Sequence, residues 1–99
     1  MEIKKTQIEG TGVLNLVGRL DVITSPKLQE SLLEIISESQ TIELDFSEVA
    51  YVSSAGLRVL LLGEKNAKAS GKTMSIKNVP PKVLEVFQIT GLAGVLTIV

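Results

Sequence analysis

The sequence predicts a single small α/β domain in which a mixed β-sheet is covered by helices, in the order β-β-α-β-α-β-α-β. The first observation is that short alternating or apolar segments are separated by longer stretches with apolar residues at helical spacing. The second is that 44% of the 99 residues are hydrophobic, which is enough for one core. No repeat or linker interrupts residues 1–99, so we expect one domain with right-handed crossovers and at least one helix layer.

The first half of the chain is expected to form two strands and a helix. Residues 3–8 have the polar interruptions of an edge strand, and residues 9–12 contain a turn signal. Residues 13–17 are almost continuously apolar, which is typical of a strand covered on both faces. Ser25-Pro26 has the pattern of a helix cap followed by proline at the first helical position. The side chains of this helix that we expect to point inward are Leu28, Leu32, Leu33, Ile35 and Ile36.

The second half of the chain is expected to alternate strands and helices. The pattern predicts a strand at 41–46, a helix at about 54–70, a strand at 72–77, a helix that opens at Pro80-Pro81, and a last strand at 94–99. If the strands that precede the first two helices are parallel, the connections 18–25 and 47–54 leave the same edge of the sheet. We then expect the two connections to be neighbours. They would lie at the edge where binding surfaces gather in such folds.

Composition excludes several classes of function. The chain has no cysteine and no histidine, which excludes disulfides, thiolate catalysis, zinc sites that need these ligands, and a Ser-His-Asp mechanism. We therefore expect no enzyme activity, cofactor or metal. The net charge of −1 and the presence of only one Tyr, two Phe and no Trp argue against direct nucleic-acid binding. No apolar run approaches the ~20 residues that span a bilayer, so a cytoplasmic protein without membrane contact is expected.

Two adjacent serines stand where the loop after the central strand turns into a helix. Ser53 is expected to cap this helix and Ser54 to start it. A phosphate on Ser54 would meet unpaired first-turn N–H groups and the positive end of the helix dipole. Capping serines are far commoner than regulatory ones, so residue spacing alone favours a purely structural cap. Gly56, in the first helical turn, is expected to let another element approach closely.

The same region resembles a known family. The signature of the STAS domain, and more narrowly of the SpoIIAA-like anti-sigma factor antagonists, is similar to Leu44-Asp45-Phe46-Ser47 together with Tyr51-Val52-Ser53-Ser54-Ala55-Gly56-Leu57-Arg58-Val59-Leu60-Leu61. Upstream, Gly18-Arg19-Leu20-Asp21 followed by a Ser25-Pro26 helix start fits the same family. Chain length and element order also match, so the resemblance covers essentially all of the sequence.

This resemblance implies a non-enzymatic phosphorylation switch. Members bind an anti-sigma factor that is also an ATP-dependent serine protein kinase, and phosphorylation of a helix-start serine releases it. A PP2C-type serine phosphatase resets the cycle. Carried over residue by residue, the phosphoacceptor is Ser54. The residues expected to bind the partner are Asp21, Thr24, Ser53, Gly56 and Arg58.

The sequence also departs from the family pattern. Many members have Asp-Ser-Ser-Gly-Leu, whereas this chain has Ser53 at the aspartate position and Ala55 at the second serine. Two adjacent hydroxyls therefore remain as possible acceptors, and Asp21 is the nearest expected carboxylate. The alternative function is a constitutive STAS docking subunit of a transport or signalling complex, which needs no phosphorylation.

Overall fold

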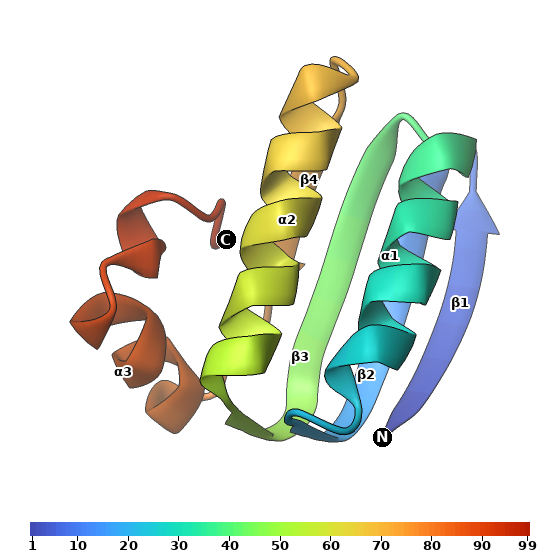
Figure 1. Cartoon of the computed structure of the whole chain (residues 1–99). Coiled ribbons are helices and arrows are strands. Elements are labelled where there is room, and N and C mark those ends of the chain that lie inside the picture. Colours follow the sequence, from blue (N-terminus) through green and yellow to red (C-terminus); the bar gives the residue numbers. More distant parts are fainter.

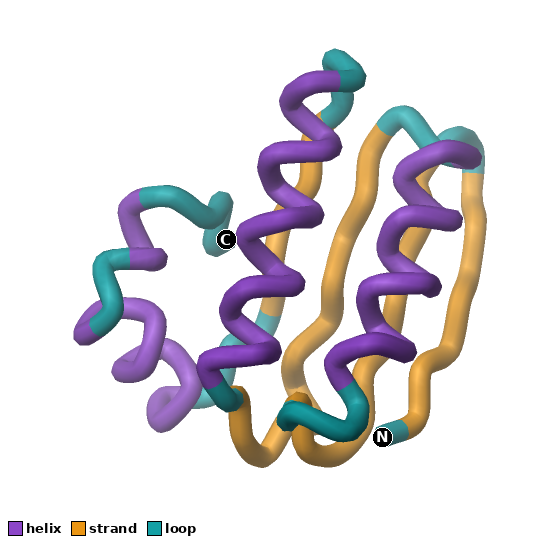
Figure 2. Tube along the Cα trace, viewed as in Figure 1, coloured by secondary structure: helices purple, strands orange, loops and turns teal.

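The computed structural model describes residues 1–99 as a four-stranded sheet with helices packed on one of its faces (Figures 1 and 2). The strands lie in the order β1-β2-β3-β4, with β1 antiparallel to β2 and the other neighbours parallel. Their bounds are β1 Glu2–Ile8, β2 Thr11–Leu20, β3 Thr41–Val52 and β4 Thr73–Lys77. The predicted mixed sheet, with residues 3–8 in an edge strand, is confirmed.

Three α-helices and one short 3₁₀ helix complete the fold. Their bounds are α1 Ser25–Glu38, α2 Ser54–Ala69, α3 Pro81–Ile89 and the 3₁₀ helix η1 Leu92–Gly94. Figure 1 shows α1 and α2 side by side over the sheet, with α3 beyond α2. None of these helices is both long and apolar enough to cross a membrane.

The β1–β2 hairpin is closed by a two-residue turn. Ile8 is paired with Thr11, and the two residues between them, Glu9 and Gly10, have φ angles of 49° and 84°. Positive φ at both positions is the type I′ geometry, whose twist matches that of paired strands. The turn signal at 9–12 is therefore confirmed, although the turn itself uses only its first two residues.

The core lies between the sheet and the α1–α2 layer. Strand residues that are paired in register point to the same face, so β2, β4 and the first half of β3 contribute alternate side chains to the core. The fully buried strand residues on this face include Leu14, Leu16, Ile42, Leu44, Phe46, Met74 and Ile76. The ring centroids of Phe46 and Phe87 lie 6.1 Å apart, and this contact anchors α3 at the end of the core.

The opposite face of the sheet is polar, and this corrects the expectation that residues 13–17 form a strand covered on both faces. Asn15 Nδ2 donates to Asp45 Oδ2 at 3.1 Å, and Lys77 Nζ lies 3.1 Å from Glu43 Oε1 on this face. Burial alternates along β2 because both crossover helices lie on one side. In α1, Leu33 is likewise more exposed than expected, at 36%.

The C-terminal strand expected at 94–99 does not form. Residues 92–94 make η1 instead, and only a single parallel bridge joins Ile98 to Ile76. Two backbone hydrogen bonds hold it, from Ile76 N to Thr97 O at 2.8 Å and from Val99 N to Ile76 O at 3.0 Å. The amides of Val95 and Leu96 both donate to Leu92 O, so only residues 97–99 are left to pair with β4. The order of regular elements is therefore β-β-α-β-α-β-α.

Candidate functional site

The β2–α1 and β3–α2 connections meet at the carboxyl edge of the sheet, as expected. Leu20 and Val52 are paired at the ends of two parallel strands, and Ser53 N donates to Leu20 O at 2.8 Å. Gly56 makes this approach possible, because a Cβ at that position would lie 2.6 Å from Leu20 Cγ and 3.1 Å from Leu20 O. The prediction that Gly56 admits another element is confirmed. Gly56 is buried, so its contribution to the surface is indirect.

The β3–α2 connection is shorter than the sequence indicated. β3 continues to Val52, so Ser53 alone separates it from α2. Ser53 has extended backbone angles, φ −89° and ψ 173°, and its Oγ accepts a hydrogen bond from Gly56 N at 3.3 Å. Ser54 is the first helical residue and is exposed to solvent. The predicted division of roles is therefore confirmed, with the Ser53 hydroxyl in the cap and that of Ser54 outside it.

The β2–α1 connection is a tight polar turn. Asp21 Oδ1 accepts hydrogen bonds from the backbone N–H groups of Ile23 and Thr24, both at 3.0 Å. Thr24 Oγ1 accepts from Asp21 N at 2.9 Å and donates to Arg19 O at 2.7 Å. The hydrogen bond from the Thr24 backbone is the largest cause of the lowered pKa of Asp21. Both side chains expected to meet a partner are thus used within the turn, where they hold its shape.

The start of α1 also differs from the expected Ser25 cap. Ser25 is already the first residue of the helix, Thr24 occupies the cap position, and the Thr24 side chain makes no cap hydrogen bond. Ser25 is 3% exposed, and its hydroxyl donates to Asp21 O. The Ser25 hydroxyl, which the sequence predicted to cap the helix, therefore bonds to the backbone carbonyl of Asp21 instead.

The apex of this turn carries two apolar side chains that the sequence analysis did not assign to the site. Val22 is 72% exposed and Ile23 is 87% exposed, because Asp21 and Thr24 point the turn away from the core. Two adjacent branched apolar residues between a strand end and a helix start were the available signal. We use "serine turn" for Ser53 and Ser54, where β3 gives way to α2. Val22 and Ile23 are the most exposed apolar side chains of the edge at which this turn lies.

An aromatic and a basic side chain flank the same edge. The guanidinium carbon of Arg19 lies 4.2 Å from the centroid of the Tyr51 ring, and Arg19 Nε lies 4.0 Å from Asp21 Oδ2. Tyr51 remains 42% exposed. The guanidinium group thus joins the ends of β2 and β3 through a cation–π contact and a weak surface ion pair.

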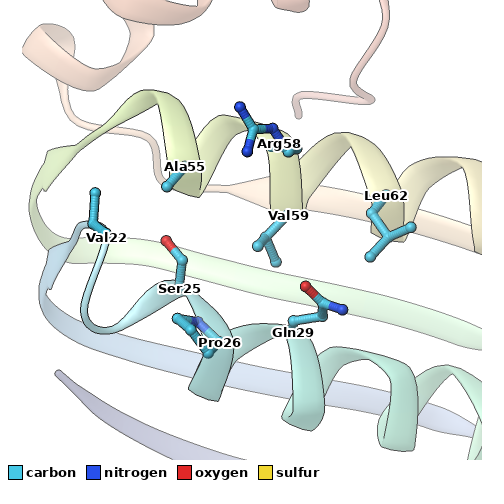
Figure 3. A pocket seen from close by; sticks show the side chains of 8 residues that line it. All are labelled: Val22, Ser25, Pro26, Gln29, Ala55, Arg58, Val59 and Leu62. Carbon is cyan, nitrogen blue, oxygen red and sulfur yellow. The ribbon is translucent and has the colours of Figure 1, made fainter.

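A groove of about 300 Å³ runs from this edge between α1 and α2 (Figure 3). It contains one charged side chain, Arg58, while Leu62 is partly exposed on its wall. Its full lining is Val22, Ser25, Pro26, Gln29, Ala55, Arg58, Val59 and Leu62. We use "switch surface" for five exposed residues at the sheet edge and in the first turns of α2, namely Val22, Ile23, Tyr51, Ser54 and Arg58.

Comparison with known proteins agrees with the resemblance seen in the sequence. A family model described as "Mlab, STAS domain" matches residues 4–98. An anti-sigma-B factor antagonist of Bacillus subtilis (strain 168) is 28% identical over 86% of this chain and 78% of its own length. An anti-sigma-B factor antagonist of Staphylococcus epidermidis is 32% identical over 76% of this chain and 70% of its own. The structure of unphosphorylated anti-sigma factor antagonist SpoIIAA superimposes with a TM-score of 0.83 at 22% identity, covering 99% of this chain and 88% of the other.

Proposed function

The chain belongs to the STAS domain family, and from this premise we propose that it is an anti-sigma factor antagonist. In this proposal the unphosphorylated protein binds an anti-sigma factor that is also a serine protein kinase. Phosphorylation of Ser54 releases that partner, and a PP2C-type phosphatase restores the binding form. The protein is then a cytoplasmic regulatory binding protein and not an enzyme. The relatives from Bacillus subtilis and Staphylococcus epidermidis are named anti-sigma-B factor antagonists, which supports an anti-sigma factor as the partner.

The observation that carries the proposal is the position of Ser54. It is exposed at the first residue of α2, and the neighbouring serine already supplies the cap. A phosphate there would lie near first-turn N–H groups that lack intrahelical partners, so the fold would tolerate it. The fold can therefore stay intact while the surface changes.

The effect on a partner follows from what surrounds Ser54. Val22 and Ile23 are apolar and exposed, and a partner that covers them must also exclude water from the serine turn. A phosphate adds about −1.5 to −2 charges at pH 7, and burying such a charge without a counterion is costly. Phosphorylation is therefore expected to weaken binding without unfolding the domain.

The first test is the intact mass of the protein purified from its own host, followed by fragmentation to assign any modified residue. A phosphate on Ser54 supports the proposal. A phosphate on Ser53 would keep the switch and move the acceptor by one residue. An unmodified protein under all growth and stress conditions would contradict the switch and favour the constitutive docking subunit.

Variants at Ser54 test the switch directly. Ser54→Ala should keep both the fold and the affinity for the host's anti-sigma factor kinase but should no longer be phosphorylated. Ser54→Asp should bind that kinase at least tenfold more weakly, with an almost unchanged unfolding temperature. Thr6→Asp is the matched control, because it adds the same charge at an exposed position of the edge strand β1. Equal affinities of Ser54→Asp and Thr6→Asp would contradict the proposal.

A further inference from the structure

Arg58 is an unpaired cation on the switch surface. It is exposed, it is the one charged residue of the groove between α1 and α2, and its side chain forms no ion pair or hydrogen bond. Arg19, the other arginine of this edge, is already engaged by the Tyr51 ring and the Asp21 carboxylate. The guanidinium group of Arg58 therefore has no anionic partner in the unmodified protein, and it lies near an exposed serine.

Arg58 and Ser54 occupy the same side of α2. They are four residues apart, and residues at this spacing are neighbours on a helix surface. The helix is regular from its first turn, since Leu57 N donates to Ser53 O at 2.9 Å. Long helical side chains lean toward the N-terminus of their helix, over the residue four positions earlier. Figure 3 shows the Arg58 guanidinium extending along α2 toward Ala55, the residue next to Ser54.

We propose that Arg58 binds the phosphate of phosphorylated Ser54 within the same helix. This inference rests on Ser54 as the phosphoacceptor of the proposed function and adds a residue that recognises the modified form. The guanidinium presents a planar fork of N–H donors that matches two phosphate oxygens. An acidic group four residues before a basic one is also the favourable order along a helix.

The pairing changes the switch surface in two ways at once. Without phosphate, Arg58 is free and offers a positive charge beside the apolar groove. With phosphate, a negative charge appears and Arg58 is drawn into a bond within its own helix. A partner with an acidic side chain opposite Arg58 would lose its counterion at the moment when the phosphate begins to repel it. A single modification would then reverse the local charge of the surface.

The test uses phosphoserine introduced at position 54 by codon reassignment, so no kinase is required. The second pKa of free phosphoserine is about 6 and can be followed by ³¹P NMR. Removing the guanidinium in Arg58→Gln should raise this pKa by about 0.15–0.4 units relative to the otherwise unchanged phosphoprotein. Arg58→Lys should give an intermediate value. Lys65→Gln, which removes an exposed cation farther along α2, should leave it unchanged.

A second readout needs no substitution. The side-chain Nε–H resonance of Arg58 in the phosphoprotein should shift with the same apparent pKa as the phosphate. An equal phosphate pKa in Arg58→Gln and the parent, or an Arg58 resonance that does not respond to phosphate titration, would overturn the inference. Because the phosphoserine is introduced synthetically, either result is independent of whether the host phosphorylates Ser54. Absence of phosphate in the host would instead remove the proposed function.

Discussion

Replacing Gly56 with alanine should destabilise the protein, although the same change inside most helices is stabilising. Alanine has a helix propensity about 1 kcal/mol better than that of glycine. At this position, however, the new Cβ would lie 2.6 Å from Leu20 Cγ and 3.1 Å from Leu20 O. Leu20 is completely buried, and its carbonyl accepts the hydrogen bond from Ser53 N at 2.8 Å. Neither atom can move without disturbing the core or the serine turn.

The net effect follows from these two opposed contributions. Overpacking of a well-filled core costs about 1–3 kcal/mol, and contact with both a buried side chain and a backbone oxygen places this site in the upper part of that range. Subtracting the propensity gain of about 1 kcal/mol leaves a loss of about 1–2 kcal/mol. For a domain of this size the unfolding temperature should fall by roughly 4–15 °C.

Urea and thermal unfolding, followed by circular dichroism, would measure this difference. Asn66→Ala is the matched control, because Asn66 is exposed on the same helix and the change improves propensity without a clash. It should raise stability by about 0.5 kcal/mol. If Gly56→Ala were as stable as the parent or more so, the close approach of α2 to β2 would not be what requires glycine. Our account of how the serine turn is positioned would then be wrong.

Two further predictions concern the turn that presents Val22 and Ile23. Thr24→Val removes the hydroxyl that joins Asp21 N and Arg19 O, so it should lower the free energy of unfolding by about 1 kcal/mol. It should also speed amide hydrogen exchange at Ile23. Unchanged exchange would show that the turn holds its shape without that hydroxyl. The pKa of Asp21 lies below its usual value of 3.8, chiefly because the Thr24 backbone N–H binds the carboxylate, so folding favours the ionised form. That stabilisation is present above the unfolded-state pKa and is lost as the pH falls through the lower folded-state pKa, so Asp21→Asn should flatten the stability curve on the acid side of the usual pKa of 3.8. Parallel curves for the two proteins would contradict this role for Asp21.

Much of the candidate site could be predicted because its signals are local. A serine before a helical run predicts a cap through the geometry of a single helical turn, and Ser53 forms that cap. The alternation of residues 41–46 predicted a strand, and the helix predicted at about 54–70 begins at Ser54. Even the need for a small residue at position 56 was visible in the sequence. The identity of the approaching element, Leu20, was not, because it comes from a distant part of the chain.

The expectations that failed depended on contacts distant in sequence. The apolar run 13–17 is compatible with one covered face or two, and only the placement of both crossover helices on one side leaves the other face polar. The segment 94–99 has the composition of a strand, yet residues 92–94 fold as η1 and a single bridge remains. In each case a local pattern allowed two structures, and packing chose between them.

Local patterns in the sequence were enough to predict the class of fold, the order of its first seven regular elements and the serine pair at the start of α2, because periodicity and capping act over a few neighbouring residues. The tertiary structure was needed to show which side chains are exposed and unpaired at this edge of the sheet. Asp21 and Thr24 are used up inside their turn, Val22 and Ile23 are thereby exposed, and Arg58 is left without a counterion. Exposure and pairing depend on what the rest of the chain places beside each side chain, and that information emerges only when β2 and β3 lie together in the sheet.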